Sequence, residues 1–84
     1  MIRYDFTKYA EKLFLKLPKN IQQRIIDKLE FYLSFPNPLS FAKRLSGSTT
    51  NAYRYQIGDY RVTFDWEGDS ILITKVGHRK DIYR

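Results

Sequence analysis

Hydrophobic and polar residues alternate at the start of the chain. Ile2, Tyr4 and Phe6 are separated by Arg3 and Asp5, and a period of two is typical of a strand with one buried face. The pattern therefore predicts a short first strand that begins almost at the N-terminus.

The pattern then changes to the period of a helix. Thr7 is a suitable N-cap preceded by the apolar Phe6, and the i, i+3, i+4, i+7 spacing that follows predicts an amphipathic helix ending near Leu17. Pro18 is favoured at the first position of a second helix, because the N–H that proline lacks has no helical partner there. That helix stops before residues 36–38, which read Pro-Asn-Pro. Its apolar face consists of Ile21, Ile25, Ile26, Leu29, Tyr32 and Leu33.

The second half of the chain predicts a sheet. Gly58-Asp59 is the signature of a short hairpin, and Gly68-Asp69 marks a second turn. The elements expected here are a possible strand at 41–45, a loop at 46–51 and stronger strands at 53–57, 60–66 and 70–76. The fold class is therefore α+β, with the order β-α-α-β-β-β-β and a twisted, mostly antiparallel sheet that has a helical hairpin packed on one face. We expect residues 1–84 to form a single domain.

A two-residue turn at Gly58-Asp59 sorts the hairpin side chains onto two faces. Gln56 lies opposite Arg61, and both point away from the helices together with Arg54. Arg54 and Arg61 become diagonal neighbours on the open side, where like charges repel and an anionic guest would relieve them. An ordinary solvated face, on which Arg61 pairs with Asp65 or with a turn acid, explains the pattern equally well. The residues expected against the helices are Tyr53, Tyr55, Ile57, Tyr60, Val62, Phe64 and Trp66.

Composition narrows the possible chemistry. The chain lacks cysteine and has one histidine, which excludes disulfides and a zinc site. Any chemistry is therefore metal-free or uses carboxylates alone, and we expect no metal and no cofactor. No segment is apolar enough for a membrane span or a secretory signal, which predicts a cytoplasmic protein. The net charge of +6 is spread evenly: residues 1–42 hold seven basic and four acidic residues, and residues 43–84 hold eight and five. Positive charge that is spread evenly along the chain indicates a polyanionic partner. Nucleic acid is the leading candidate, and an acidic protein is the second.

The C-terminal segment carries candidate functional groups. His78 is suited to moving protons near neutral pH, and Arg79, Lys80 and Tyr83 follow it. A lone histidine beside a glycine is more often structural, and Tyr83 can instead anchor the tail in the core. On the first helix, Lys8, Lys12 and Lys16 form a stripe at i, i+4 spacing, which is either a solvated face or a contact for RNA phosphates.

Two runs of sequence resemble the RelE/ParE superfamily of bacterial and archaeal toxins. They are YRYQIGDYRV at 53–62 and VGHRKDIYR at 76–84, and the histidine, arginine and tyrosine of the second run are more similar to the RelE branch. The resemblance implies the toxin of a toxin–antitoxin pair that cleaves mRNA in the ribosomal A site without metal. It also implies an acidic antitoxin, with operator DNA bound only by the toxin–antitoxin complex.

Residues are assigned roles by their match to the family motifs. Arg61 matches the phosphate-binding arginine, and Arg54 and Gln56 stand where two basic residues are expected. Arg54 replaces a lysine that could act as the base. Because a guanidinium does not lose its proton, Arg54 cannot take that role, and His78 or Tyr83 would have to move the proton. A weakly active or inactive antitoxin-binding module and a ParE-like inhibitor of DNA gyrase remain alternatives. The predicted catalytic residues are Arg54, Arg61, His78, Arg79 and Tyr83, and the predicted RNA contacts are Lys8, Lys12, Lys16, Gln56 and Lys80.

Overall fold

A computed structural model describes residues 1–45 and 51–82 of the chain. Nearly all of the loop predicted at 46–51 lies outside these residues, and so does Tyr83. The described elements follow one another in the predicted order, with one 3-10 helix and one short C-terminal helix in addition.

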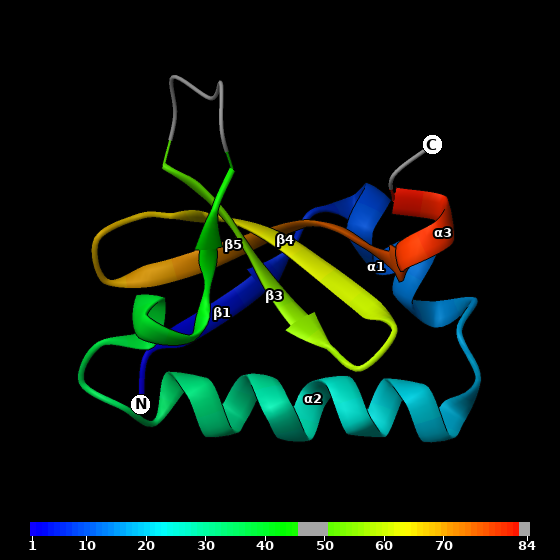
Figure 1. The fold of residues 1–84 in the computed structure, drawn as a ribbon, viewed down its shortest axis with the longest axis horizontal. Helices are drawn as coiled ribbons and strands as arrows, with labels where there is room; N and C mark the ends of the chain where they lie inside the picture. The colour runs from blue at the N-terminus through cyan, green and yellow to red at the C-terminus, as the bar shows by residue number, and fades with distance from the viewer. Residues whose placement is uncertain (46–50, 83–84) are drawn as a thin grey trace.

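Five strands form one mixed sheet in the order β1-β5-β4-β3-β2 (Figure 1). β1 (Arg3–Phe6) lies parallel to β5 (Ser70–His78). β5, β4 (Tyr60–Trp66), β3 (Ala52–Ile57) and β2 (Lys43–Arg44) are antiparallel neighbours. The α+β class with a mostly antiparallel sheet is therefore confirmed, and the parallel pair joins the first strand to the last.

Local sequence signals set the limits of the two main helices. α1 (Lys8–Leu15) begins after Thr7, whose Oγ1 accepts a hydrogen bond from the backbone N–H of Ala10 at 3.1 Å, as the N-cap prediction requires. α1 ends two residues before the predicted limit. α2 (Lys19–Leu33) begins one residue later than predicted, because Pro18 has the extended backbone of a cap residue and not that of a helix.

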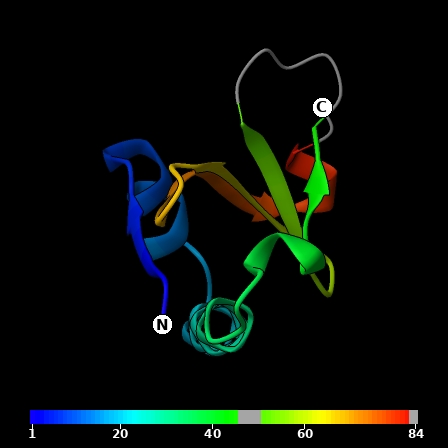
Figure 2. The same ribbon diagram turned by 90° about the vertical axis from the view of Figure 1, so that its left-hand side faces the viewer.

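Both helices pack on the sheet and share one core with it. α1 contributes Ala10, and α2 contributes Ile25, Leu29 and Leu33, all fully buried. Figure 2 views α2 nearly along its axis, with the strands lying to one side of it. The sheet contributes the buried residues Tyr55, Ile57, Val62, Phe64, Ile71, Ile73 and Val76.

The 3-10 helix η1 (Pro38–Phe41) is tied to the sheet by one buried tyrosine. Asn37 caps η1 by accepting a hydrogen bond from the N–H of Leu39 at 3.2 Å. The hydroxyl of Tyr55 donates to the carbonyl oxygen of Pro38 at 3.0 Å, and burial raises the pKa of Tyr55 well above its usual range. Because Phe41 belongs to η1, only two residues of the possible strand at 41–45 pair with β3.

The hairpin of β3 and β4 has the predicted register. Gln56 pairs with Arg61, Arg54 pairs with Thr63, and Gly58 closes the turn with a positive φ of 59°. The residues expected against the helices are buried or packed against the core. The prediction that Arg61 is open to solvent is wrong, since its exposed fraction is 6%. Its side chain lies on the predicted face but folds back against the turn.

A short helix that the sequence pattern did not indicate ends the described chain. β5 continues two residues beyond its predicted limit, and α3 (Arg79–Ile82) follows directly. The Ile82 side chain lies 3.5 Å from the position that a Cβ on Gly77 would occupy. Because Gly77 pairs with Arg61 across the sheet, α3 lies beside that buried arginine.

Candidate functional site

Arg61 is a buried cation at the β3–β4 turn. Its Nη1 donates hydrogen bonds to the carbonyl oxygens of Gly58 at 2.9 Å and Tyr60 at 3.0 Å. Its Nε is buried and, among the described residues, has no hydrogen-bond partner. A buried charge without a counter-ion is unfavourable, and a buried donor without an acceptor adds to the cost. The site therefore favours an anion that can accept from Arg61.

Arg79 lies on the other side of the same turn. Its backbone N–H donates to the carbonyl oxygen of Asp59 at 2.7 Å, and its Nε lies 3.7 Å from the Asp59 carboxylate. Both side chains are more than half exposed, and exposed ion pairs of this kind contribute little stability. Arg79 can consequently exchange Asp59 for an anionic ligand at small cost.

Arg54 and Gln56 extend this basic surface along β3. Gln56 pairs directly with Arg61, and Arg54 lies two residues further along the strand on the same face. The pairing continues sideways from Arg54 to Lys43 on β2, and through Thr63 to Lys75 on β5. The structure thus places Arg54, Gln56, Arg61 and Arg79 around one end and one face of the hairpin. Their roles in binding or catalysis stay predictions.

His78 does not join these arginines. It pairs with Tyr60, which lies on the core side of the sheet, and the two rings meet edge to face at 5.4 Å. The His78 Nδ1 accepts a hydrogen bond from the N–H of Lys80 at 3.1 Å, so the neutral ring carries its proton on Nε2. His78 and Arg61 therefore lie on opposite faces of the sheet.

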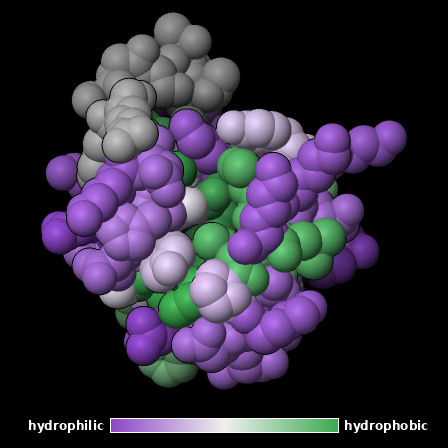
Figure 3. Space-filling view, turned by 90° about the vertical axis from the view of Figure 1, so that its right-hand side faces the viewer, coloured by the Kyte–Doolittle hydropathy of each residue, from purple (hydrophilic) through white to green (hydrophobic). Residues whose placement is uncertain are grey.

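His78 instead lines a depression of about 400 Å³ between α1, the end of β5 and α3. Figure 3 shows this side of the molecule, with apolar side chains in the hollow and polar ones around it. The predicted RNA contacts Lys8, Lys12, Lys16 and Lys80 are all exposed, and of these Lys16 lies at this depression. The apolar lining includes Leu13, Leu17, Val76 and Ile82.

Tertiary structure adds two residues that the sequence pattern did not single out. Asp59 was noted as a turn residue, but its pairing with Arg79 depends on where β5 ends. Arg24 of α2 places its Nη1 3.4 Å from the position that a Cβ on Gly58 would occupy. No periodicity or motif near Arg24 signals this contact, because it joins elements that are distant in sequence.

In residues 1–45 and 51–82, no three histidine, aspartate or glutamate side chains gather as metal ligands would. Likewise, none of the helices in the described ranges has the length and apolar character of a membrane span.

A family model and a curated relative both match almost the whole chain, and both are described as toxins. The family described as the ParE toxin of the type II toxin–antitoxin system, parDE, matches residues 4–83. Among curated proteins, Toxin RelE3 of Methanocaldococcus jannaschii is 32% identical over 81 residues, which cover 93% of this chain and 91% of the relative.

Solved structures resemble the fold over nearly its whole length. The RelB-RelE antitoxin–toxin complex from Methanococcus jannaschii matches with a TM-score of 0.74 and 30% identity, covering 93% of each chain. The isolated Escherichia coli RelE toxin matches with a TM-score of 0.74, covering 99% of this chain and 92% of that chain. The identity in the second case is 21%, so that comparison concerns the fold alone.

Proposed function

This chain belongs to the RelE/ParE superfamily of toxin–antitoxin toxins, and we propose that it is a RelE-like, ribosome-dependent endoribonuclease. In this proposal it cleaves mRNA in the ribosomal A site without a metal or another cofactor. It works in the cytoplasm and is held inactive by an acidic antitoxin. The toxin–antitoxin complex, and not the toxin alone, would contact operator DNA.

The buried guanidinium of Arg61 is the observation that carries the proposal. Cleavage by the 2′-hydroxyl gathers negative charge on a five-coordinate phosphorus, and fixed donors in a site with little water stabilise that charge strongly. Arg61 is held in place by two carbonyl oxygens and keeps its Nε free among the described residues. Arg79 and Arg54 supply further positive charge beside it. RNA phosphate has the charge and the acceptor oxygens that such a site requires.

The proposed cleavage consists of one bond formed, one bond broken and two proton transfers. The 2′-oxygen forms a bond to phosphorus, the bond from phosphorus to the 5′-oxygen breaks, and a cyclic phosphate and a 5′-hydroxyl result. One group must take the 2′-proton and one must give a proton to the 5′-oxygen. Arginine does neither. His78 lies on the opposite face of the sheet from Arg61, and its role as a proton carrier, like that of Tyr83, stays a prediction.

Two observations favour alternatives. The separation of His78 from the arginines favours a weakly active toxin that mainly binds its antitoxin. The match to a family described as ParE toxins favours a ParE-like inhibitor of DNA gyrase.

An acidic antitoxin is the proposed protein partner. The chain carries a net charge of +6, and the solved archaeal relative at 30% identity is a toxin bound to an antitoxin. The apolar depression beside Lys16 and His78 suits an amphipathic segment with carboxylates at its edges.

An in vitro translation reaction with mapped message ends tests the function. We expect cleavage within codons, and at least a hundred-fold loss of rate, on the order of a lost oxyanion-type donor, in Arg79→Gln and Arg61→Lys. Arg3→Gln is the matched control for Arg79→Gln, because it removes the same charge from β1 at the far edge of the sheet. Thermal unfolding of each variant checks the fold.

The outcomes separate the candidates. Intact messages together with inhibited supercoiling would support the gyrase interpretation, and intact messages with active gyrase would support the antitoxin-binding module. Cleavage that survives both arginine substitutions would eliminate the proposed site.

A further inference from the structure

Arg24 of α2 reaches the turn that holds the two site arginines. Its Nη1 lies 3.4 Å from the position that a Cβ on Gly58 would occupy. The carbonyl oxygen of Gly58 accepts from Arg61, and the neighbouring Asp59 pairs with Arg79. Three guanidinium groups from three different elements thus surround a two-residue turn. We propose that Arg24 is a further RNA-contacting residue, which binds a backbone phosphate next to the one held by Arg61 and Arg79. This inference rests on the proposed function.

The charge balance at the turn supports an anion beside Arg24. Asp59 is the carboxylate that pairs with one of the three arginines. Within residues 1–45 and 51–82, Arg24 forms no hydrogen bond or ion pair with any side chain. Cations placed close together repel one another, and an RNA strand relieves this repulsion at more than one point because its phosphates repeat along the chain.

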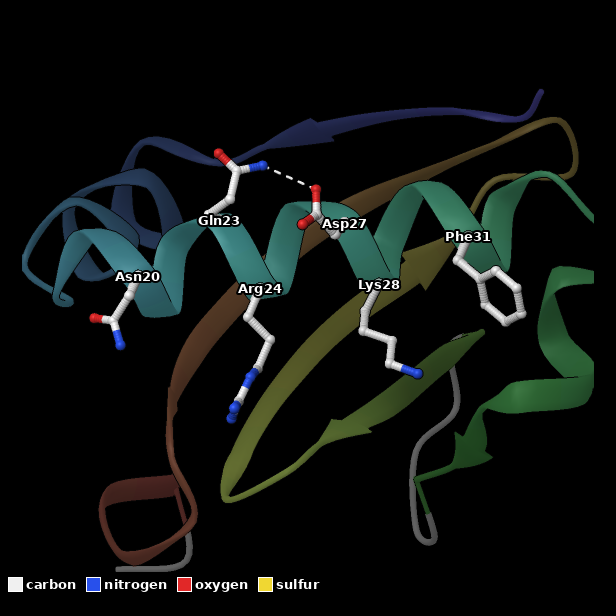
Figure 4. Close-up of a pocket in the computed structure, with 6 residues that line it drawn as sticks. All are labelled: Asn20, Gln23, Arg24, Asp27, Lys28 and Phe31. Atoms are coloured by element: carbon white, nitrogen blue, oxygen red, sulfur yellow. Dashed lines mark hydrogen bonds between the residues drawn. The ribbon is translucent and has the colours of Figure 1, made fainter.

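Positive charge continues along the surface of α2 away from the turn. A shallow hollow runs along the helix, and Figure 4 shows Arg24, Lys28 and Phe31 extending from α2 toward the β3–β4 hairpin. The acid that lines the hollow, Asp27, extends to the other side, where it accepts a hydrogen bond from Gln23 at 2.8 Å. The side of α2 that overlooks the hairpin is therefore basic.

An aromatic ring at the far end of the hollow favours RNA over a simple anion. Phe31 is half exposed, and the Lys28 ammonium lies 5.5 Å from its ring centroid. Cations that follow a backbone beside an aromatic ring are the usual means of binding single-stranded nucleic acid. Continuity with the Arg61 site also favours RNA, because an acidic protein segment would have no need of the buried Arg61.

Binding of an uncleavable RNA tests the inference apart from catalysis. The probe is a single-stranded oligoribonucleotide whose 2′-hydroxyls are methylated, so that no nucleophile remains, and its affinity is measured by fluorescence anisotropy over a salt series. For single strands, each lost phosphate contact reduces the slope of log affinity against log salt by about 0.7. We expect this reduction in Arg24→Gln, which corresponds to about a five-fold smaller loss of affinity per ten-fold rise in salt.

Arg3→Gln is the matched control, since it makes the same chemical change on the exposed part of β1, at the other edge of the sheet. It should leave the slope at the wild-type value. In translation-coupled cleavage, Arg24→Gln should raise KM several-fold with little change in kcat, because a phosphate held equally in the ground state and the transition state affects binding alone.

Each result decides between defined possibilities. Equal salt slopes for Arg24→Gln and Arg3→Gln, with both variants folded, would overturn the inference even if the wild type cleaves RNA. An Arg24-dependent slope in a protein that cleaves nothing would support the inference and remove the nuclease. If Arg24→Gln weakens only the binding of an acidic peptide of the antitoxin type and leaves RNA binding unchanged, the surface binds a protein partner and the inference is wrong.

Discussion

The hydrogen bond from Tyr55 joins the sheet to η1, and its contribution to the free energy of unfolding can be measured. Replacement of Tyr55 by Phe removes one hydroxyl and leaves the buried carbonyl oxygen of Pro38 without its donor. A net hydrogen bond contributes about 1 kcal/mol, and an unpaired buried carbonyl costs about 1 to 3 kcal/mol. We therefore expect the free energy of unfolding to fall by about 1 to 3 kcal/mol, with a decrease in Tm of at least about 4 °C for a domain of this size.

The same substitution has a signature in alkaline solution. Tyrosine in the unfolded chain ionises near pH 10, and burial raises the pKa of Tyr55 in the folded protein above that value. Above pH 10 the unfolded state therefore binds fewer protons than the folded state, so stability decreases as the pH rises. One such group gives a limiting slope of about 1.4 kcal/mol per pH unit. Because phenylalanine has no proton to lose, the difference between the two proteins should shrink above pH 10.

Urea unfolding at pH 7 and at two values above pH 10 measures both effects. Tyr53→Phe is the control, since Tyr53 lies on the same face of β3 but is only half-buried, and its hydroxyl has no hydrogen bond within the described ranges. A Tyr55→Phe protein as stable as the wild type at pH 7, or a difference that stays constant above pH 10, would refute the proposed burial of this hydroxyl.

Three further substitutions test the turn and the first helix. Gly58→Ala should reduce stability by about 1 to 2 kcal/mol in urea unfolding, because its φ of 59° disfavours a Cβ, and Gly58→Asn should cost less; equal stability of both with the wild type would contradict this. Thr7→Ala should cost about 1 kcal/mol through loss of the N-cap bond to Ala10, with Thr7→Ser close to the wild type in the same measurement. Asp59→Asn should change stability by less than about 1 kcal/mol and tighten binding of the methylated RNA, since Arg79 loses a competing carboxylate; weaker binding would show that Asp59 is needed to position Arg79.

Sequence alone predicted the elements whose signals are local. Gly58-Asp59 set the register of the β3–β4 hairpin, and alternation along both strands set which residues face the helices. Thr7 marked the start of α1. These predictions succeed because a tight turn and a cap depend on neighbouring residues, and the hydrophobic pattern agrees with both.

The features that the sequence pattern could not predict depend on contacts between distant segments. Alternation placed Arg61 on the correct face, but it could not show that the guanidinium folds back on the turn beside α3. The position of His78 depends on an irregularity between β4 and β5, where Thr63 pairs with Lys75 while Phe64 pairs with Ile73. A shift of one residue exchanges the faces of a strand, so a local pattern cannot place His78 relative to Arg61.

The parallel pairing of the first and last strands has a consequence for synthesis. β1 emerges from the ribosome before the other strands, yet its partner β5 is the last of the described strands to be made and supplies Ile71, Ile73 and Val76 to the hydrophobic interior. The sheet therefore cannot be completed on a nascent chain while the β5 segment is still enclosed in the exit tunnel, and contacts this distant in sequence form slowly. β1 is an edge strand whose one neighbour in the described sheet is β5, so its backbone stays without a strand partner until β5 has left the tunnel.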